Sequence, residues 1–147
     1  MHLPIRLVMS GVVACGLVLT ARGDAEKADL AKFAGKWKVV GITYEGQKLK
    51  AGHTQEVVGD KILFGGGLCG KVTLHPKETP RRFDVDHSDA GGRPRERERY
   101  KGIYEFDGDD NLTWCMSQKT GDPYPRAFES KPGDDTRLFV LQRVKKK

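Results

Sequence analysis

Short runs of alternating polar and apolar residues, bounded by glycine, proline, aspartate or asparagine, constrain the fold more than any other feature. The runs lie at residues 36–44, 55–58, 61–64, 70–75, 81–87, 95–106, 112–117, 127–129 and 137–144. Runs at this spacing, with turn residues between them, are typical of all-β sandwiches and barrels. We therefore predict an all-β fold, a small antiparallel β-barrel of about eight or nine strands.

One short helix is expected at residues 24–34, ahead of the first strand, and residues 47–53 are expected to be irregular. In the first strand, strict alternation places four residues on one face: Trp37, Val39, Gly41 and Thr43.

Residues 1–23 have the composition of an export signal. Residues 7–20 form an uncharged apolar run, and Ala21 and Gly23 are small residues of the kind that signal peptidase reads. The run is shorter than the ~20 residues that a membrane-spanning helix needs. We expect cleavage after Gly23 and one exported domain, residues 24–147, in the periplasm, at the cell surface or in the medium.

A second processing route is open at Cys15. The segment 12–15 loosely resembles a lipobox, in which Cys15 would be lipidated and would anchor the protein to a membrane. Against this route, the apolar run continues through residues 17–19, whereas a lipobox cysteine usually ends it.

The formal net charge is +6, and Arg6 and Arg22 of the predicted signal contribute two of these charges. Charged residues of both signs are interspersed, which indicates a solvated surface and no nucleic-acid partner.

Three residues at the two ends of the predicted sheet carry a resemblance. Gly35 and Trp37 form a Gly-x-Trp motif after the helix, and Arg143 lies in the last strand. This arrangement resembles that of lipocalins and other calycins, in which the tryptophan packs at the closed end of the barrel under the arginine. The resemblance implies structural roles for Gly35, Trp37 and Arg143, and such a contact contributes roughly 0.5–2 kcal/mol.

Further segments extend the resemblance over nearly all of residues 24–147. They are residues 29–30 with 33–40, then 102–109, 112 with 114–115, 128–133 and 138–144. Together they are similar to a family of small exported, lipocalin-like domains of unknown function that is abundant in planctomycete bacteria. The resemblance implies the fold and the compartment but no mechanism.

Five aromatic residues are candidates to line the barrel: Phe83, Tyr100, Tyr104, Phe106 and Trp114. A barrel of this type binds small apolar or amphipathic ligands in its interior, and we expect a binding protein of that kind. The alternative is that the rings fill the core and the protein is a structural or interaction module.

Four arginines alternate along one predicted strand: Arg93, Arg95, Arg97 and Arg99. In an extended strand they share a face, where guanidinium groups could bind an anionic ligand or an acidic partner. The alternative is a solvated edge strand, partly neutralised by Asp84 and Asp86.

Cys69 and Cys115 are the cysteines of the predicted mature chain. The oxidising compartment permits a Cys69–Cys115 disulfide, and two buried thiols are the alternative.

Asp107, Asp109 and Asn111 resemble the first half of a calcium loop, but Leu112 and Gln118 replace its required glycine and glutamate. The histidines lack ligand spacing, and no Gly-x-Ser-x-Gly motif occurs. We expect no metal, no cofactor and no enzymatic activity.

Overall fold

The computed structural model describes the backbone of residues 20–64, 67–88 and 93–147, and the side chains of residues 23–63, 69–88, 93 and 98–147. Its elements are α1 (Thr20–Phe33), β1 (Gly35–Tyr44), β2 (Gln47–Leu49), β3 (Thr54–Val58), β4 (Lys61–Phe64), β5 (Gly67–His75), β6 (Arg82–Ser88), β7 (Pro94–Asp107), β8 (Asn111–Ser117) and β9 (Thr136–Arg143). Among the described residues, no helix combines the length and the hydropathy needed to cross a lipid bilayer.

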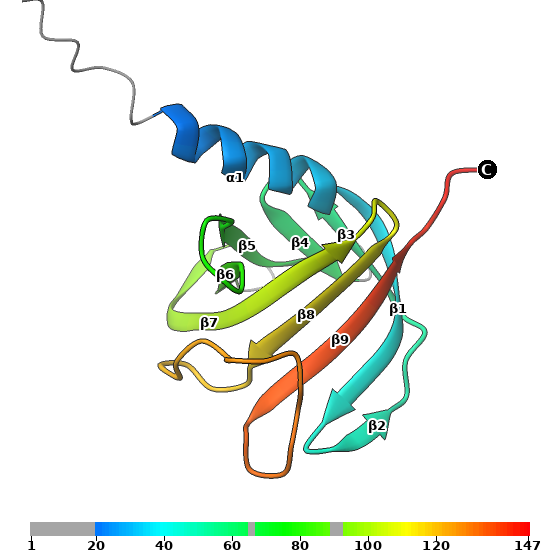
Figure 1. Cartoon of the computed structure of the whole chain (residues 1–147), viewed down its shortest axis with the longest axis vertical. Helices are drawn as coiled ribbons and strands as arrows, with labels where there is room; N and C mark the ends of the chain where they lie inside the picture. Colours follow the sequence, from blue (N-terminus) through cyan, green and yellow to red (C-terminus); the bar gives the residue numbers. More distant parts are fainter. Residues whose placement is uncertain (1–19, 65–66, 89–92) are drawn as a thin grey trace, which may run out of the picture.

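The strands form one antiparallel sheet in the order β2-β1-β3-β4-β5-β6-β7-β8-β9, and β1 also pairs with β9 (Figure 1). This last pairing closes β1 and β3 to β9 into an eight-stranded barrel, with β2 beside β1 as an extra strand. The predicted all-β barrel with one short helix is therefore confirmed. Closure gives the strands of the ring partners on both sides, so that their backbone groups are paired within the sheet.

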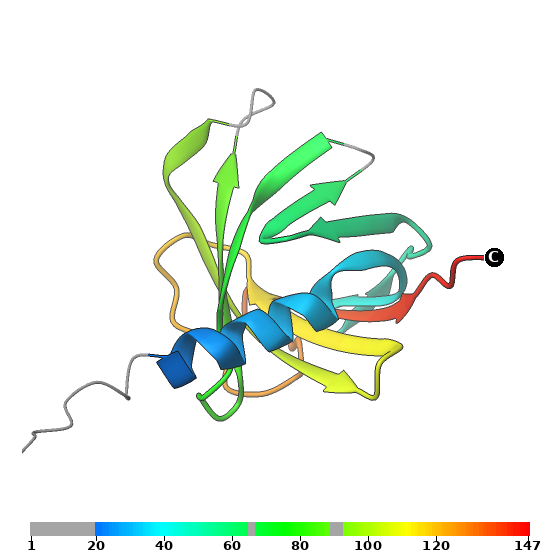
Figure 2. The same ribbon diagram turned by 90° about the horizontal axis from the view of Figure 1, so that it is seen from above.

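The helix α1 lies across one end of the barrel (Figures 1 and 2). It starts before the predicted residue 24 and before the predicted cleavage position after Gly23. Gly35, at φ 116°, turns the chain from α1 into β1, and few side chains tolerate that conformation. Immediately after it, the Trp37 Nε1–H donates to the carbonyl oxygen of Phe33 at 2.7 Å. The chain thus passes directly from the helix into the first strand of the barrel.

A β-bulge corrects the predicted face of the first strand. The register of β1 against β9 shifts between Val39 and Gly41, so Ile42 is the next buried residue. The prediction that Gly41 and Thr43 share the face of Val39 is wrong, because the extra residue of a bulge reverses the alternation beyond it.

Two other segments differ from expectation. Residues 47–49, expected to be irregular, form β2, because the turn at Glu45 and Gly46 folds them back onto β1. Residues 127–129, predicted as a strand, belong to a loop. Side-chain hydrogen bonds hold this loop, where a strand would have backbone pairing. The Ser130 hydroxyl donates to the carbonyl oxygen of Thr136 at 2.6 Å, and Thr136 Oγ1 donates to the carbonyl oxygen of Glu129 at 3.2 Å.

Candidate functional site: the barrel interior

The half of the barrel next to α1, here called the closed half, is filled by aromatic rings. Phe33 reaches in from the helix, and its ring centroid lies 5.1 Å from those of Tyr104 and Phe106. Trp114 stacks on Phe33 at 6.1 Å and meets Phe83 at 5.8 Å. Four of the five predicted ligand-lining residues therefore belong to one ring cluster, in which Tyr104, Phe106 and Trp114 contact Phe33 and Phe83 contacts Tyr104 and Trp114. Their rings occupy the space that a ligand would need at this end.

The helix is bound to this end by a polar contact as well. The hydroxyl of Tyr104 donates to the Asp29 carboxylate at 2.7 Å, and Arg81 lies 3.3 Å from the same oxygen. Burial raises the pKa of Tyr104, and the hydrogen bond to Asp29 and its negative charge raise it further. Tyr104 is therefore part of the attachment of α1, and its hydroxyl is already occupied.

Arg143 closes the same end. Its guanidinium lies 4.2 Å from the centre of the Trp37 ring, which is the arrangement that the lipocalin resemblance implies. Its nitrogens also donate to the carbonyl oxygens of Lys32 at 2.5 Å, Ala34 at 2.7 Å and Asp109 at 2.8 Å.

At the opposite end of the barrel, five half-buried side chains of the described residues face inward, and we call this set the mouth. Each is two positions along its strand from a buried residue of the inner face, so the strand pleat directs it inward. They are Tyr44 in β1, His87 in β6, Tyr100 in β7, Met116 in β8 and Arg137 in β9.

Tyr100, the fifth predicted ligand-lining residue, is thus separated from the other four. Its ring lies 4.7 Å from that of His87, a residue that the sequence analysis did not assign to a site. The predicted aromatic set is divided between two ends of the barrel, and the part that is not filled by Phe33 lies at the mouth.

Among the described residues, three side chains of the inner face hold buried polar atoms that lack hydrogen-bond partners. They are both amide atoms of Gln55, the indole Nε1 of Trp114 and the Nε of Arg137. Gln55 is only 1% exposed and lies in β3 two residues before the core residue Val57. Since the great majority of buried polar groups are hydrogen-bonded, these atoms indicate a position where a polar group of a ligand could bind inside the barrel.

Sequence reasoning missed Gln55 and Arg137. The available signal was that each stands at an inward position of a strand, next but one to an apolar residue. For Arg137 this signal was clear, because Phe139 and Leu141 continue the same face.

The predicted arginine face is only partly described, since the side chains of Arg95 and Arg97 lie outside the described residues. Arg93 is exposed. Arg99 forms a two-point ion pair with Asp86, at 2.6 and 3.2 Å, and this hydrogen-bonded contact raises the pKa of Arg99. The charge of Arg99 is therefore balanced by Asp86 on the neighbouring strand β6.

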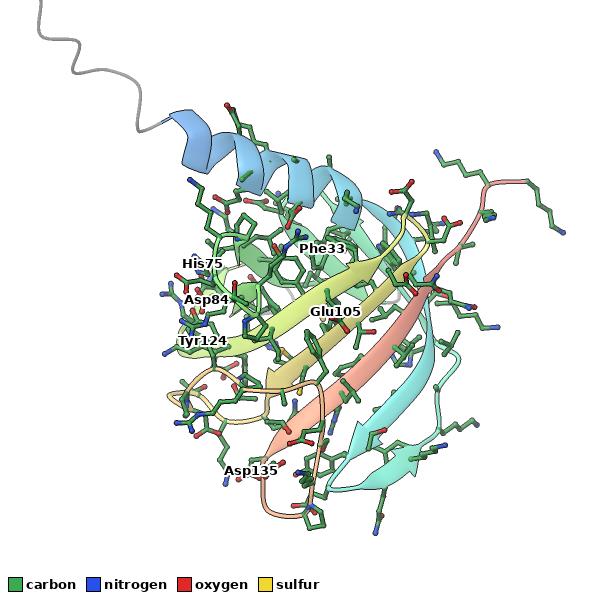
Figure 3. All side chains as sticks on the ribbon, viewed as in Figure 1. Phe33, His75, Asp84, Glu105, Tyr124 and Asp135 are labelled. Atoms are coloured by element: carbon green, nitrogen blue, oxygen red, sulfur yellow. The ribbon has the colours of Figure 1, made fainter. Side chains whose placement is uncertain are left out.

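Asp84 lies outside that pairing and joins a cluster on the outer face (Figure 3). One of its oxygens is 2.7 Å from His75 Nε2, and the other accepts a hydrogen bond from the Tyr124 hydroxyl at 2.8 Å. Burial, followed by the bond to Asp84, raises the pKa of Tyr124 to about 12. Tyr124 consequently stays protonated at neutral pH and anchors its loop to the barrel wall.

Of the two alternatives for Cys69 and Cys115, a disulfide or two thiols, the structure has two thiols. They lie in β5 and β8, with β6 and β7 between them. Three strand spacings are roughly 14 Å along the sheet, whereas a disulfide requires Cα atoms within about 7 Å. Cys115 is buried on the outer face and donates to the Glu129 carbonyl at 3.3 Å, and burial raises the pKa of its thiol.

No metal site is visible in the described part of the chain, where no three His, Cys, Asp or Glu side chains gather as ligands. The Asp107–Asn111 segment is the turn between β7 and β8, and Asp109 and Asp110 face Lys32 and Lys145.

Comparison with protein-family models, curated proteins and solved structures finds no match to this chain. A function for this chain is therefore inferred from the barrel and from the geometry of its interior.

Proposed function

We propose that this protein is an exported, lipocalin-like binding protein that holds a small amphipathic ligand inside the barrel. The observation that carries the proposal is the buried Gln55, whose amide oxygen and nitrogen both lack a partner in the described part of the chain. A buried amide without hydrogen bonds costs about 1–3 kcal/mol, which a bound polar group would recover.

The polar and apolar groups of the inner face indicate which kind of ligand the barrel would bind. Gln55 offers a donor and an acceptor, and Trp114 Nε1 offers a second donor. The core cluster supplies apolar residues on the same inner face: Val39, Ile42, Val72, Val85 and Phe139. A ligand with an apolar body and one or two oxygen-bearing groups fits such a wall. Binding without catalysis is the action that we assign to it.

The proposal is tested by native mass spectrometry of the protein purified from its own host, compared with the same sample after denaturation. We expect an additional mass that is lost on denaturation and that is absent from a Gln55→Leu variant. Gln142→Leu, the same change at an exposed position of β9, is the matched control and should keep the adduct. A bare mass for the wild-type protein would overturn the proposal.

The denatured mass also tests the proposed export. A chain that begins after Gly23 is expected, and a chain that begins with a lipid-modified Cys15 would identify the membrane-anchored alternative. A chain that retains residues 1–23 would contradict both routes.

An interaction module is the second candidate, and a surface hollow of about 950 Å³ favours it. This hollow lies outside the barrel, with Val58 and Val144 exposed along it and with Lys36 and Lys145 among its lining residues. It would suit an acidic segment of a partner protein with apolar side chains. A bare native mass together with a co-purifying protein would favour this candidate.

A further inference from the structure

We infer that the ligand carries a carboxylate group and that the guanidinium of Arg137 binds it at the mouth of the barrel. The inference rests on the proposed binding function and adds to it the chemical class of the ligand and the residue that selects it.

The strand β9 carries two arginines on its inner face, and their surroundings differ. Arg143, at the closed end, lies over Trp37 and donates to three carbonyl oxygens. Arg137, at the mouth, lies with its guanidinium 5.1 Å from the centre of the Tyr44 ring, but its buried Nε has no acceptor. One arginine thus completes the structure of the barrel, whereas the other presents a donor for which no described residue is an acceptor.

The charge of Arg137 is also uncompensated within the described residues, since no carboxylate there lies within 4.0 Å of its guanidinium. The acids nearest in the sequence have other partners: Asp135 pairs with Lys119, and Asp134 accepts from the backbone of Lys131. Glu98 of β7 makes its own contact elsewhere, and β8 separates its strand from β9 by two spacings, roughly 10 Å.

A carboxylate matches this position better than a neutral group does. The planar guanidinium presents its N–H groups as a fork that fits two carboxylate oxygens, and stacking on Tyr44 limits its rotation. Hydrogen bonds to a charged partner contribute about 1.5–3 kcal/mol, against about 0.5–1.5 kcal/mol for neutral pairs.

The length of the ligand is limited by the closed half. A chain that entered at the mouth would run along Ile42 and Phe139 and would end at the packed rings of Phe33 and Trp114. The ligand of this inference is therefore a short chain with one terminal carboxylate.

The test is calorimetric titration of the full mature protein with octanoate and with 1-octanol, which share the chain and differ in the charged group. We expect octanoate to bind at least about tenfold more tightly, which corresponds to about 1.4 kcal/mol. Arg137→Gln should remove this preference, because it lowers the affinity for octanoate more than that for 1-octanol. Arg126→Gln, the same change in an exposed loop, should retain the preference.

Three outcomes would overturn the inference. Equal affinity of the wild-type protein for both probes would do so, as would an unchanged preference in Arg137→Gln, or no binding of octanoate. If Arg137→Gln does not fold, Arg137→Lys retains the charge without the fork and is expected to keep only part of the preference.

Failure of the inference is distinguishable from failure of the proposed function. A wild-type protein that retains a native adduct but does not prefer octanoate remains a binding protein for another class of ligand. A wild-type protein that has a bare native mass and binds neither probe loses both assignments.

Discussion

Arg143 covers the indole ring of Trp37 at 4.2 Å while its three nitrogens donate to carbonyl oxygens of α1, of the turn that follows it and of the β7–β8 turn. Trp37 in turn donates to the carbonyl of Phe33. The two residues therefore join the first strand, the last strand and the helix at the closed end of the barrel.

Arg143→Ala should lower the free energy of unfolding by about 2–4 kcal/mol. The substitution removes the cation–π contact and leaves the carbonyl groups of Lys32 and Ala34 without their charged donor. Urea denaturation measures the effect, and Arg126→Ala in an exposed loop is the control, expected within about 0.5 kcal/mol of wild type. An equal effect in both variants would contradict the role assigned to Arg143.

Tyr104→Phe should cost about 1–3 kcal/mol at neutral pH, because Asp29 is buried and loses its hydroxyl donor. The same substitution should reduce the alkaline loss of stability. The pKa of Tyr104 is raised in the folded protein, so above about pH 10 the unfolded chain releases a proton that the folded protein keeps. Stability then falls by about 1.4 kcal/mol per pH unit for this group.

Urea denaturation between pH 8 and about pH 11 measures this slope, over the range in which an unfolded tyrosine ionises. The wild-type protein should lose stability more steeply than Tyr104→Phe above about pH 10. Identical slopes would show that the Tyr104 proton is not linked to folding.

Gly102→Ala should destabilise the barrel by about 1–3 kcal/mol or more, because a methyl group at this position would overlap the ring of Phe83 and lie 2.7 Å from the Cys115 carbonyl oxygen. Gly41→Ala is the matched control, since its nearest neighbour is Val140 Cβ at an ordinary 3.5 Å. Adding Phe83→Leu should recover part of the loss at Gly102. Additive effects of the two changes would contradict the overlap.

The two thiols should differ in their reaction with iodoacetamide at pH 8. Cys115 is buried and its pKa is raised, so little thiolate forms and the reagent has poor access. Intact-mass measurement should show Cys69 modified first and Cys115 only after unfolding, without prior reduction. A Cys69→Ser variant allows the slow reaction of Cys115 to be measured alone. If modification requires a reductant, the two cysteines form a disulfide and the prediction fails.

Much of the fold could be predicted from local patterns. Alternation and turn residues located eight of the nine strands of the described chain to within a few residues, and the Gly-x-Trp motif with Arg143 indicated the contact at the closed end. These features depend on neighbouring residues, where strand periodicity and turn chemistry act.

The bulge in β1 and the loop at residues 127–129 could not be predicted in this way. The bulge arises from the pairing of β1 with β9, whose partner residues are distant in sequence. The loop is held by Ser130 and Thr136, whose contacts form only after the sheet has closed.

The sequence by itself determined a small antiparallel barrel, its leading helix and the residues that have a strong local signature, because alternation and turn formation are local. Only the tertiary structure decided which inward residues lack partners. Phe33 enters from α1 and fills the closed half, whereas Gln55, opposite Trp37, and Arg137, at the mouth, keep polar atoms that no described residue satisfies. Whether a side chain finds a partner depends on every strand around it, and closure of the barrel brings those strands together.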